Sequence, residues 1–114
     1  MMLQRAAAGL GAIGVALGAF GAHGLEGRLT AQAAGWWDTA TFYLLVHAVA
    51  VLAVARGGRT RAAQRAGWLM ASGAATFAGT LYAMALGAPT VLGAVTPVGG
   101  VLMIAGWISL ALEA

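Results

Sequence analysis

The chain lacks cysteine and lysine altogether and holds only six arginines and three acidic residues among its 114 positions. The absence of cysteine excludes disulfide bonds, thiolate metal sites, iron–sulfur clusters and covalently attached c-type haem. Charged residues make up 8% of the chain and hydrophobic residues 61%, whereas soluble domains average about 25% and about 45–50%. A soluble domain of this length could not bury so much apolar surface. The net charge of +3 arises from scarce acids rather than from a basic face, so no nucleic-acid partner is expected.

The few charges leave residues 6–25, 39–55 and 66–112 uncharged. The hydrocarbon core of a bilayer, about 30 Å thick, is crossed by about 20 apolar residues in a helix. The first two runs are each long enough for one span, and the third is long enough for two. We therefore predict an all-α membrane protein with a single membrane domain over residues 1–114, built as a four-transmembrane antiparallel helix bundle with Gly/Ala-rich packing in the lipid bilayer. The predicted spans are about 6–25, 36–55, 66–87 and 90–112.

The first span also has features of a signal peptide. Arg5 provides a basic start, and Ala19 and Gly21 would suit the small-residue positions of a cleavage site. Glycines dilute this apolar stretch, however, and nothing after it resembles a secreted domain. We therefore interpret it as a membrane span.

Helix-terminal signals refine these boundaries. Thr30 is a candidate N-cap for a second helix that begins near Ala31. Trp36 and Trp37 are then expected at the level of the lipid headgroups, where indole rings prefer to lie. The Gly-Ala-Pro sequence at residues 87–89 predicts the end of the third helix.

Pro97 stands inside the fourth predicted span. A proline in that position removes a backbone hydrogen bond and clashes with the preceding turn, and Gly99 and Gly100 weaken the same stretch. We therefore predict a Pro-kinked fourth helix. The kink is either a structural feature whose freed carbonyls are satisfied inside the bundle, or the lining of a small cavity open to the outside.

The arginines predict the orientation of the protein. Arg56, Arg59, Arg61 and Arg65 crowd one short loop, and Arg5 lies on the same side if there are four spans. Cytoplasmic loops are enriched in basic residues, so both termini and this loop are predicted in the cytoplasm, in a multi-pass protein of the cell membrane (the bacterial inner membrane). We interpret the loop as a topology determinant, with binding of lipid headgroups or of a partner as the alternative.

Small residues at every fourth position predict where helices approach closely, because association within lipid depends on close packing. Two such stripes are Gly14, Gly18 and Ala22 in the first span, and Ala71, Ala75, Gly79 and Ala83 in the third. We interpret both as packing within the bundle, with a homo-oligomer interface as the alternative. The neighbouring hydroxyl stripe of Ser72, Thr76 and Thr80 is expected to bond back to carbonyls of its own helix.

Uncharged polar side chains within the spans gather in the half of the membrane away from the arginine-rich loop. A rise of ~1.5 Å per residue places His47 ~13 Å below a boundary at Asp38. Ionisable residues within spans are functional candidates by default, which here means the two histidines. The candidate polar site consists of His23, Tyr43, His47, Thr80, Tyr82, Thr96 and Pro97.

Four motifs carry a resemblance to a known family. They are Gly-Ala-Phe-Gly-Ala-His-Gly-Leu at 18–25, Tyr43 and His47 followed by Ala-Val-Ala-Val-Leu at 48–52, Phe-Ala-Gly-Thr-Leu-Tyr at 77–82, and Val-Thr-Pro-Val-Gly-Gly at 95–100 with Gly-Trp at 106–107. Over essentially its whole length, the chain closely resembles the small membrane proteins known as domain of unknown function 423, whose animal relatives are called transmembrane protein 256. The resemblance implies a four-span membrane protein without an assigned activity.

The chain departs from the pattern of that family in two places. Leu44 stands where the family often has a glutamine, and Ala78 and Thr80 stand where it often has serine. If those polar groups take part in a function, this chain retains a reduced set. That set is His23, Tyr43, His47, Tyr82 and Thr96.

Three classes of function fit these observations. The first is a non-enzymatic membrane component, namely a scaffold, assembly factor or accessory subunit with an unidentified membrane partner. The second is a carrier or channel for a small solute or proton that uses the polar layer and the broken fourth helix. The third is a haem- or metal-binding protein with His23 and His47 as ligands, which their depth difference of ~8 Å disfavours. We predict the first class, without a catalytic residue, metal or cofactor, because the uncharged runs contain no carboxylate and no nucleophile paired with a base.

Overall fold

The computed structural model describes residues 1–57 and 60–113 of the chain. The described residues contain no β-strand, so the predicted all-α class is confirmed. Of the predicted arginine loop, Arg59 lies outside the described residues. The elements are α1 (Met2–His23), α2 (Ala31–Gly57), α3 (Arg61–Ala85), the 3₁₀-helical segment η1 (Thr90–Ala94) and α4 (Thr96–Glu113).

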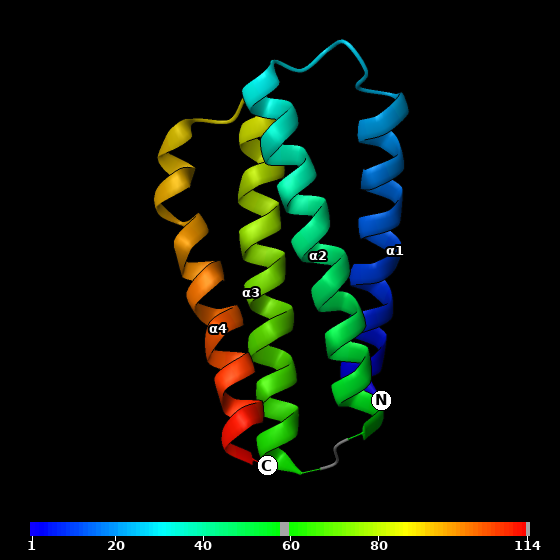
Figure 1. The fold of residues 1–114 in the computed structure, drawn as a ribbon, viewed down its shortest axis with the longest axis vertical. Coiled ribbons are helices and arrows are strands. Elements are labelled where there is room, and N and C mark those ends of the chain that lie inside the picture. The colour runs from blue at the N-terminus through cyan, green and yellow to red at the C-terminus, as the bar shows by residue number, and fades with distance from the viewer. Residues whose placement is uncertain (58–59, 114) are drawn as a thin grey trace.

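Successive helices lie side by side and run in opposite directions (Figure 1). The N-terminus, the end of α2, the start of α3 and the end of α4 all lie at the bottom of that view. We call this end, to which Arg5, Arg56, Arg61 and Arg65 belong, the arginine end. The connections from α1 to α2 and from α3 to η1 lie at the other end, which we call the opposite end.

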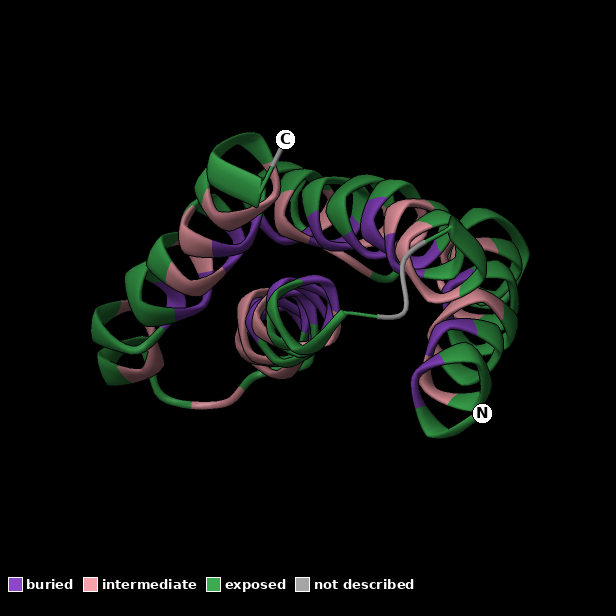
Figure 2. Ribbon diagram, turned by 90° about the horizontal axis from the view of Figure 1, so that it is seen from below, coloured by how far each residue is buried: buried purple, intermediate pink, exposed green. Residues whose placement is uncertain are grey.

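Within the described part of the chain, three segments are each long and apolar enough to cross a membrane, namely α1, α2 and the stretch Thr90–Glu113 that combines η1 with α4. The position of α3 explains why it is less apolar. Figure 2 shows α3 end-on, flanked by α4, α2 and α1, and α3 packs against both α2 and α4. It also contributes more buried residues than any other helix. Much of its surface therefore faces protein rather than solvent or lipid.

The predicted helix ends are confirmed. The Thr30 hydroxyl accepts a hydrogen bond from the Ala33 amide at 3.0 Å, which caps the start of α2. At the end of α3, Gly87 adopts a φ of 106°, a left-handed conformation that favours glycine. Its amide donates to the Met84 carbonyl at 3.0 Å and the Ala88 amide donates to the Ala83 carbonyl at 2.9 Å. This paired arrangement terminates the helix.

The fourth segment is divided, but a kink at Pro97 within one helix is not confirmed. η1 ends at Ala94 and α4 begins at Thr96, so the break lies ahead of the proline. Pro97 then falls in the first turn of α4, where a residue without an amide hydrogen leaves no intrahelical bond unmade. The Val98 amide donates to the Val95 carbonyl at 2.9 Å. This bond connects the residue between η1 and α4 to the first turn of α4.

Glycines bring the backbones of α3 and α4 close together. A Cβ atom built on Gly73 would lie 2.7 Å from the Gly99 carbonyl oxygen, and one on Gly99 would lie 2.5 Å from the Phe77 amide nitrogen. One on Gly106 would lie 2.9 Å from the Ala66 carbonyl oxygen. Because these neighbours are backbone atoms, they could not move aside without separating the helices.

The predicted small-residue stripes match the observed packing only in part. Gly14 is buried, and a Cβ atom there would meet the Leu45 side chain at 2.7 Å. Gly18 is half-buried against Thr41, Ala71 is buried and Ala83 is half-buried. Ala22, Ala75 and Gly79, in contrast, are exposed.

The prediction of packing within the bundle is therefore wrong for Ala22, Ala75 and Gly79. The physical reason is that this chain carries small residues on several sides of each helix, so a four-residue spacing does not identify the side that faces a neighbour. The close face of α3 runs through Gly73 instead, and the exposed stripe leaves the homo-oligomer alternative untested.

Candidate functional site

His47 lies in the middle of α2 and is 5% exposed. Its Nε2 atom accepts a hydrogen bond from the Trp107 indole Nε1 at 3.0 Å, and its Nδ1 atom lies 2.8 Å from the Tyr43 carbonyl oxygen. An indole nitrogen only donates, so Nε2 must be the unprotonated nitrogen and Nδ1 must carry the hydrogen that is donated to Tyr43. The two contacts together fix the orientation of the ring.

The His47–Trp107 bond is also a structural link. The backbones of α2 and α4 do not pack against each other directly, because α3 contacts both of them. The imidazole and the indole therefore bridge two helices through side chains alone. Their rings meet edge to face, with centroids 5.9 Å apart.

Thr80 and Thr96 form the corresponding link between α3 and α4. Their hydroxyl oxygens lie 2.6 Å apart. Thr80 also lies 3.1 Å from the Phe77 carbonyl oxygen and Thr96 lies 3.3 Å from the Leu92 carbonyl oxygen. Each hydroxyl has one hydrogen, so one threonine donates to the other, which in turn donates to a carbonyl of its own segment. Ser72 bonds back to its helix as predicted, since its hydroxyl lies 2.7 Å from the Trp68 carbonyl oxygen. Thr80 does so when Thr96 is the donor between the two threonines.

Tyr82 links α3 to α2. Its hydroxyl lies 2.7 Å from the Thr41 hydroxyl, and its ring meets the Trp37 ring edge to face with centroids 4.5 Å apart. Trp37 is only 3% exposed, and its indole nitrogen donates to the Leu17 carbonyl of α1 at 2.8 Å. The ring and the nitrogen of Trp37 therefore both have partners inside the bundle, and its level relative to the lipid headgroups stays a prediction.

Glycines of the first helix make room for this contact. A Cβ atom on Gly21 would lie 2.3 Å from the Trp37 indole nitrogen, and one on Gly18 would lie 3.1 Å from the Thr41 methyl group. The Gly-Ala-Phe-Gly motif is thus a docking surface for one face of α2, with Phe20 beside the Trp37 ring at a centroid distance of 6.1 Å.

The remaining predicted residues lie apart from these links. His23 is exposed at the end of α1, whereas His47 is buried in the middle of α2, so the two histidines do not form a pair. Tyr43 is 38% exposed and stacks on His47 with ring centroids 6.1 Å apart. The candidate polar residues therefore form several helix-to-helix junctions rather than one site.

Pro97 lines a hollow of about 360 Å³ between α3, η1 and α4, on the side of the opposite end. The lining is mostly apolar, with hydroxyls from Thr90 and Thr96. The residues around it are Trp36, Phe77, Leu81, Met84, Thr90, Gly93, Thr96 and Pro97. Pro97 and Thr96 therefore lie beside a hollow, as one of the two interpretations of the break predicts, and the opening of that hollow to the outside stays a prediction.

The arginine end carries two further contacts. Arg56 donates to the Gln4 side-chain oxygen at 3.5 Å, and the Thr60 hydroxyl donates to the Glu113 carboxylate. These bonds tie α2 to α1 and the start of α3 to the end of α4. Arg61 and Arg65 are exposed.

The geometry does not fit haem or metal ligation by the two histidines. Both ring nitrogens of His47 already have hydrogen-bond partners within the bundle, and His23 is on another helix and exposed. Among the described residues, no three side chains of the His, Cys, Asp or Glu type are gathered into one group. A ligand set would therefore require His47 to give up a helix link.

Sequence reasoning missed Trp37, Thr41 and Trp107 as partners. A signal for Trp107 was available, because an indole N–H inside a span needs an acceptor and the His47 imidazole also lies inside a span. A signal for Trp37 was also available. Gly18 and Gly21 are three residues apart, so they lie on one face of α1 and leave a recess there that a large side chain can fill.

Comparisons with known proteins agree with this description. A family model described as "Protein of unknown function (DUF423)" matches residues 17–100. A UPF0382 membrane protein of Haemophilus influenzae is 46% identical over 101 residues, which are 85% of this chain and 80% of that protein. A UPF0382 membrane protein of Staphylococcus saprophyticus is 43% identical over 98 residues, 84% and 82% of the two chains. The UPF0382 membrane protein YwdK of Bacillus subtilis is 40% identical over 106 residues, 90% and 86%. No solved structure matches the chain.

Proposed function

Because this chain belongs to the DUF423 family and its relatives are membrane proteins, we propose that it is a non-enzymatic component of the membrane, a small helical scaffold or accessory subunit that acts with another membrane protein. The observation that carries this proposal is that its polar side chains form hydrogen bonds between helices. Seven side chains that could support chemistry instead link one helix to another, namely those of Trp37, Thr41, His47, Thr80, Tyr82, Thr96 and Trp107. Among the described side chains, no buried nitrogen or oxygen lacks a hydrogen-bond partner.

All four helices are proposed to span the bilayer. α3 extends over 25 residues, about 37 Å at 1.5 Å per residue, and it has no charge after Arg65. Its lower hydropathy is compatible with a span because its neighbours α2 and α4 cover part of its surface. The arginine end is proposed to face the cytoplasm, since cytoplasmic loops carry the excess of basic residues.

The absence of cysteine makes this orientation directly testable. Single substitutions Glu26→Cys and Ala62→Cys place a thiol at exposed positions of the opposite end and of the arginine end. In intact cells, a membrane-impermeant maleimide is expected to label Glu26→Cys at once and Ala62→Cys only after permeabilisation. The parent chain, which has no thiol, is the background control. Labelling in the reverse order would contradict the proposed orientation.

The proposed function itself predicts a partner. Purification from the native membrane in a mild detergent is expected to yield this chain with a stable, stoichiometric membrane-protein partner and no haem absorption. The double variant His47→Leu/Trp107→Phe, which replaces one polar link by apolar side chains, is expected to retain that partner. A monodisperse protein that repeatedly purifies without any partner would contradict the proposal.

A carrier for a small, weakly polar solute is the second candidate, and the hollow beside Pro97 is the observation that favours it. Thr96 would offer its hydroxyl to a solute there only by giving up its bond to Thr80. Under this candidate, vesicles that contain the protein dissipate a solute gradient and Thr96→Val slows the flux severalfold. Vesicles that remain tight to every solute tried would leave the scaffold proposal as the better one.

A further inference from the structure

α1 and α3 enclose an apolar groove near the arginine end, with a volume of about 340 Å³. The two helices touch where Leu3 fills the space above Gly67, whose Cβ atom would lie 2.4 Å from a Leu3 methyl carbon. Beyond that contact α1 packs mainly on α2, and a space between α1 and α3 remains. The groove is lined by Ala6, Gly9, Leu10, Ile13, Trp68, Ala71, Ser72 and Ala75.

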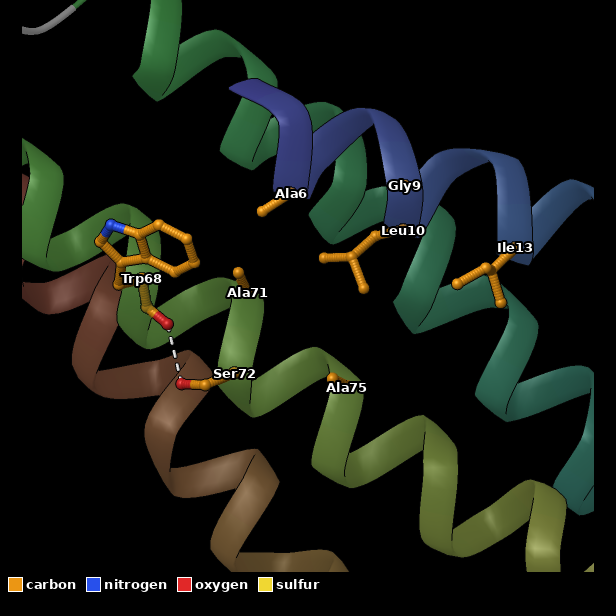
Figure 3. A pocket seen from close by; sticks show the side chains of 8 residues that line it. All are labelled: Ala6, Gly9, Leu10, Ile13, Trp68, Ala71, Ser72 and Ala75. Atoms are coloured by element: carbon orange, nitrogen blue, oxygen red, sulfur yellow. Dashed lines mark hydrogen bonds between the residues drawn. The ribbon is translucent and has the colours of Figure 1, made fainter. Parts of the chain in front are cut away.

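The lining presents small and apolar groups to the space, as Figure 3 shows. The one hydroxyl among them, on Ser72, is bonded back to the Trp68 carbonyl at 2.7 Å and is not available inside the groove. Trp68 stands at one end of the groove with its ring nitrogen on the side away from Ala75. From Trp68 to Ala75 the groove extends for about 10 Å along α3, enough for the first part of one acyl chain.

Basic side chains stand at the end of the groove that Trp68 marks. Along α3, Arg61, Arg65, Trp68, Ser72 and Ala75 follow one another at alternating spacings of four and three, which places them on one face of the helix. On α1, Arg5 precedes the groove-lining Gly9 by one turn. The guanidinium groups of Arg5, Arg61 and Arg65 form no hydrogen bond or ion pair with a described residue.

Trp68 is unlike the two indoles that link helices. Trp37 and Trp107 both donate their N–H to protein acceptors, whereas the Trp68 N–H has no acceptor among the described residues. Trp68 is also 43% exposed. An indole with an apolar ring and a free N–H is suited to the level of lipid headgroups and ester carbonyls.

From these observations we infer that the groove between α1 and α3 binds one anionic phospholipid. One acyl chain lies in the apolar groove, the Trp68 N–H faces the ester region, and the phosphate lies between the arginines of α1 and α3. Charge complementarity selects this occupant over a zwitterionic lipid, because each arginine near the membrane surface favours an anionic headgroup. The inference does not depend on whether the protein is a scaffold or a carrier.

Native mass spectrometry of the purified full-length protein tests this inference. The protein is mixed with equal amounts of phosphatidylglycerol and phosphatidylcholine that have identical acyl chains. We expect one phosphatidylglycerol retained per chain, with a preference of about tenfold over phosphatidylcholine. The double variant Arg61→Gln/Arg65→Gln is expected to lose most of that preference, whereas Arg28→Gln, at the opposite end, is expected to keep it.

Groove-filling variants test the position of the acyl chain. Ala75→Leu projects a larger side chain into the groove from α3, and Gly9→Leu does so from α1, where no heavy atom lies within 4 Å of the new Cβ. Both are expected to lower lipid retention severalfold while circular dichroism and the elution volume stay unchanged. Gly79→Leu, one turn beyond the groove, is the matched control and is expected to retain lipid.

Three outcomes would overturn the inference. The first is equal retention of the two lipids by the parent chain. The second is full retention by both groove-filling variants in folded form. The third is a dimer that dissociates in Ala75→Leu without loss of lipid, since the groove would then be occupied by a second copy of the chain.

Discussion

Gly99→Ala is expected to lower the free energy of unfolding by about 3 kcal/mol. The added methyl group would lie 2.5 Å from the Phe77 amide nitrogen and 2.6 Å from the Gly73 carbonyl oxygen. Both are backbone atoms of α3, so α4 could accept the methyl group only by moving away from its neighbour. In lipid this loss is not offset by a hydrophobic gain, because helix association depends on close packing. Unfolding of the detergent-solubilised protein, followed by circular dichroism, measures the difference.

The neighbouring glycine provides a matched control. A Cβ atom on Gly100 would have no heavy atom within 4 Å, and alanine is the better helix former by about 1 kcal/mol. Gly100→Ala is therefore expected to leave the stability unchanged or to raise it slightly. If Gly99→Ala and Gly100→Ala proved equally stable, the close approach of α3 and α4 described above would be wrong.

The contrast between these two glycines also explains which parts of the fold could be predicted. Charge placement and local signals such as Thr30 depend only on nearby residues, so the helices and their ends could be inferred. The packed face of α3 depends on which helices lie beside it, and nothing in a glycine- and alanine-rich sequence specifies that arrangement. The stripe through Ala75 and Gly79 was therefore as plausible from the sequence as the observed face through Gly73.

The candidate site was predictable to a similar extent. Counting residues gives the depth of a side chain in the membrane, which was enough to group His47 with Thr80 and Thr96. It does not give the direction in which the side chain points around the helix axis. The structure directs His47 to Trp107 and Thr80 to Thr96, so residues at similar depths serve separate helix pairs. The direction of a side chain around its helix axis, rather than its depth, therefore decides whether polar groups form one site.

The bond between His47 and Trp107 gives the second large expected effect. Trp107→Phe keeps an aromatic ring but removes the one donor that the described residues offer to Nε2 of His47, which leaves this buried acceptor without a partner. The loss of stability is expected to be about 1–2 kcal/mol, since an unsatisfied buried acceptor costs about 1–3 kcal/mol and interhelical bonds in membranes reach about 1.7 kcal/mol. Trp68→Phe, at an exposed indole without a protein acceptor, is the control and is expected to change stability by less than about 0.5 kcal/mol.

A double-mutant cycle separates the bond from the loss of the rings. His47→Leu alone removes the acceptor and leaves the Trp107 N–H without its partner, whereas His47→Leu/Trp107→Phe removes both groups together. If the bond links α2 to α4, the double variant is expected to lose about 1 kcal/mol less free energy of unfolding than the two single variants lose together. Strictly additive losses would mean that the imidazole contributes nothing through this contact. The link between α2 and α4 through these two side chains would then not contribute to the stability of the bundle.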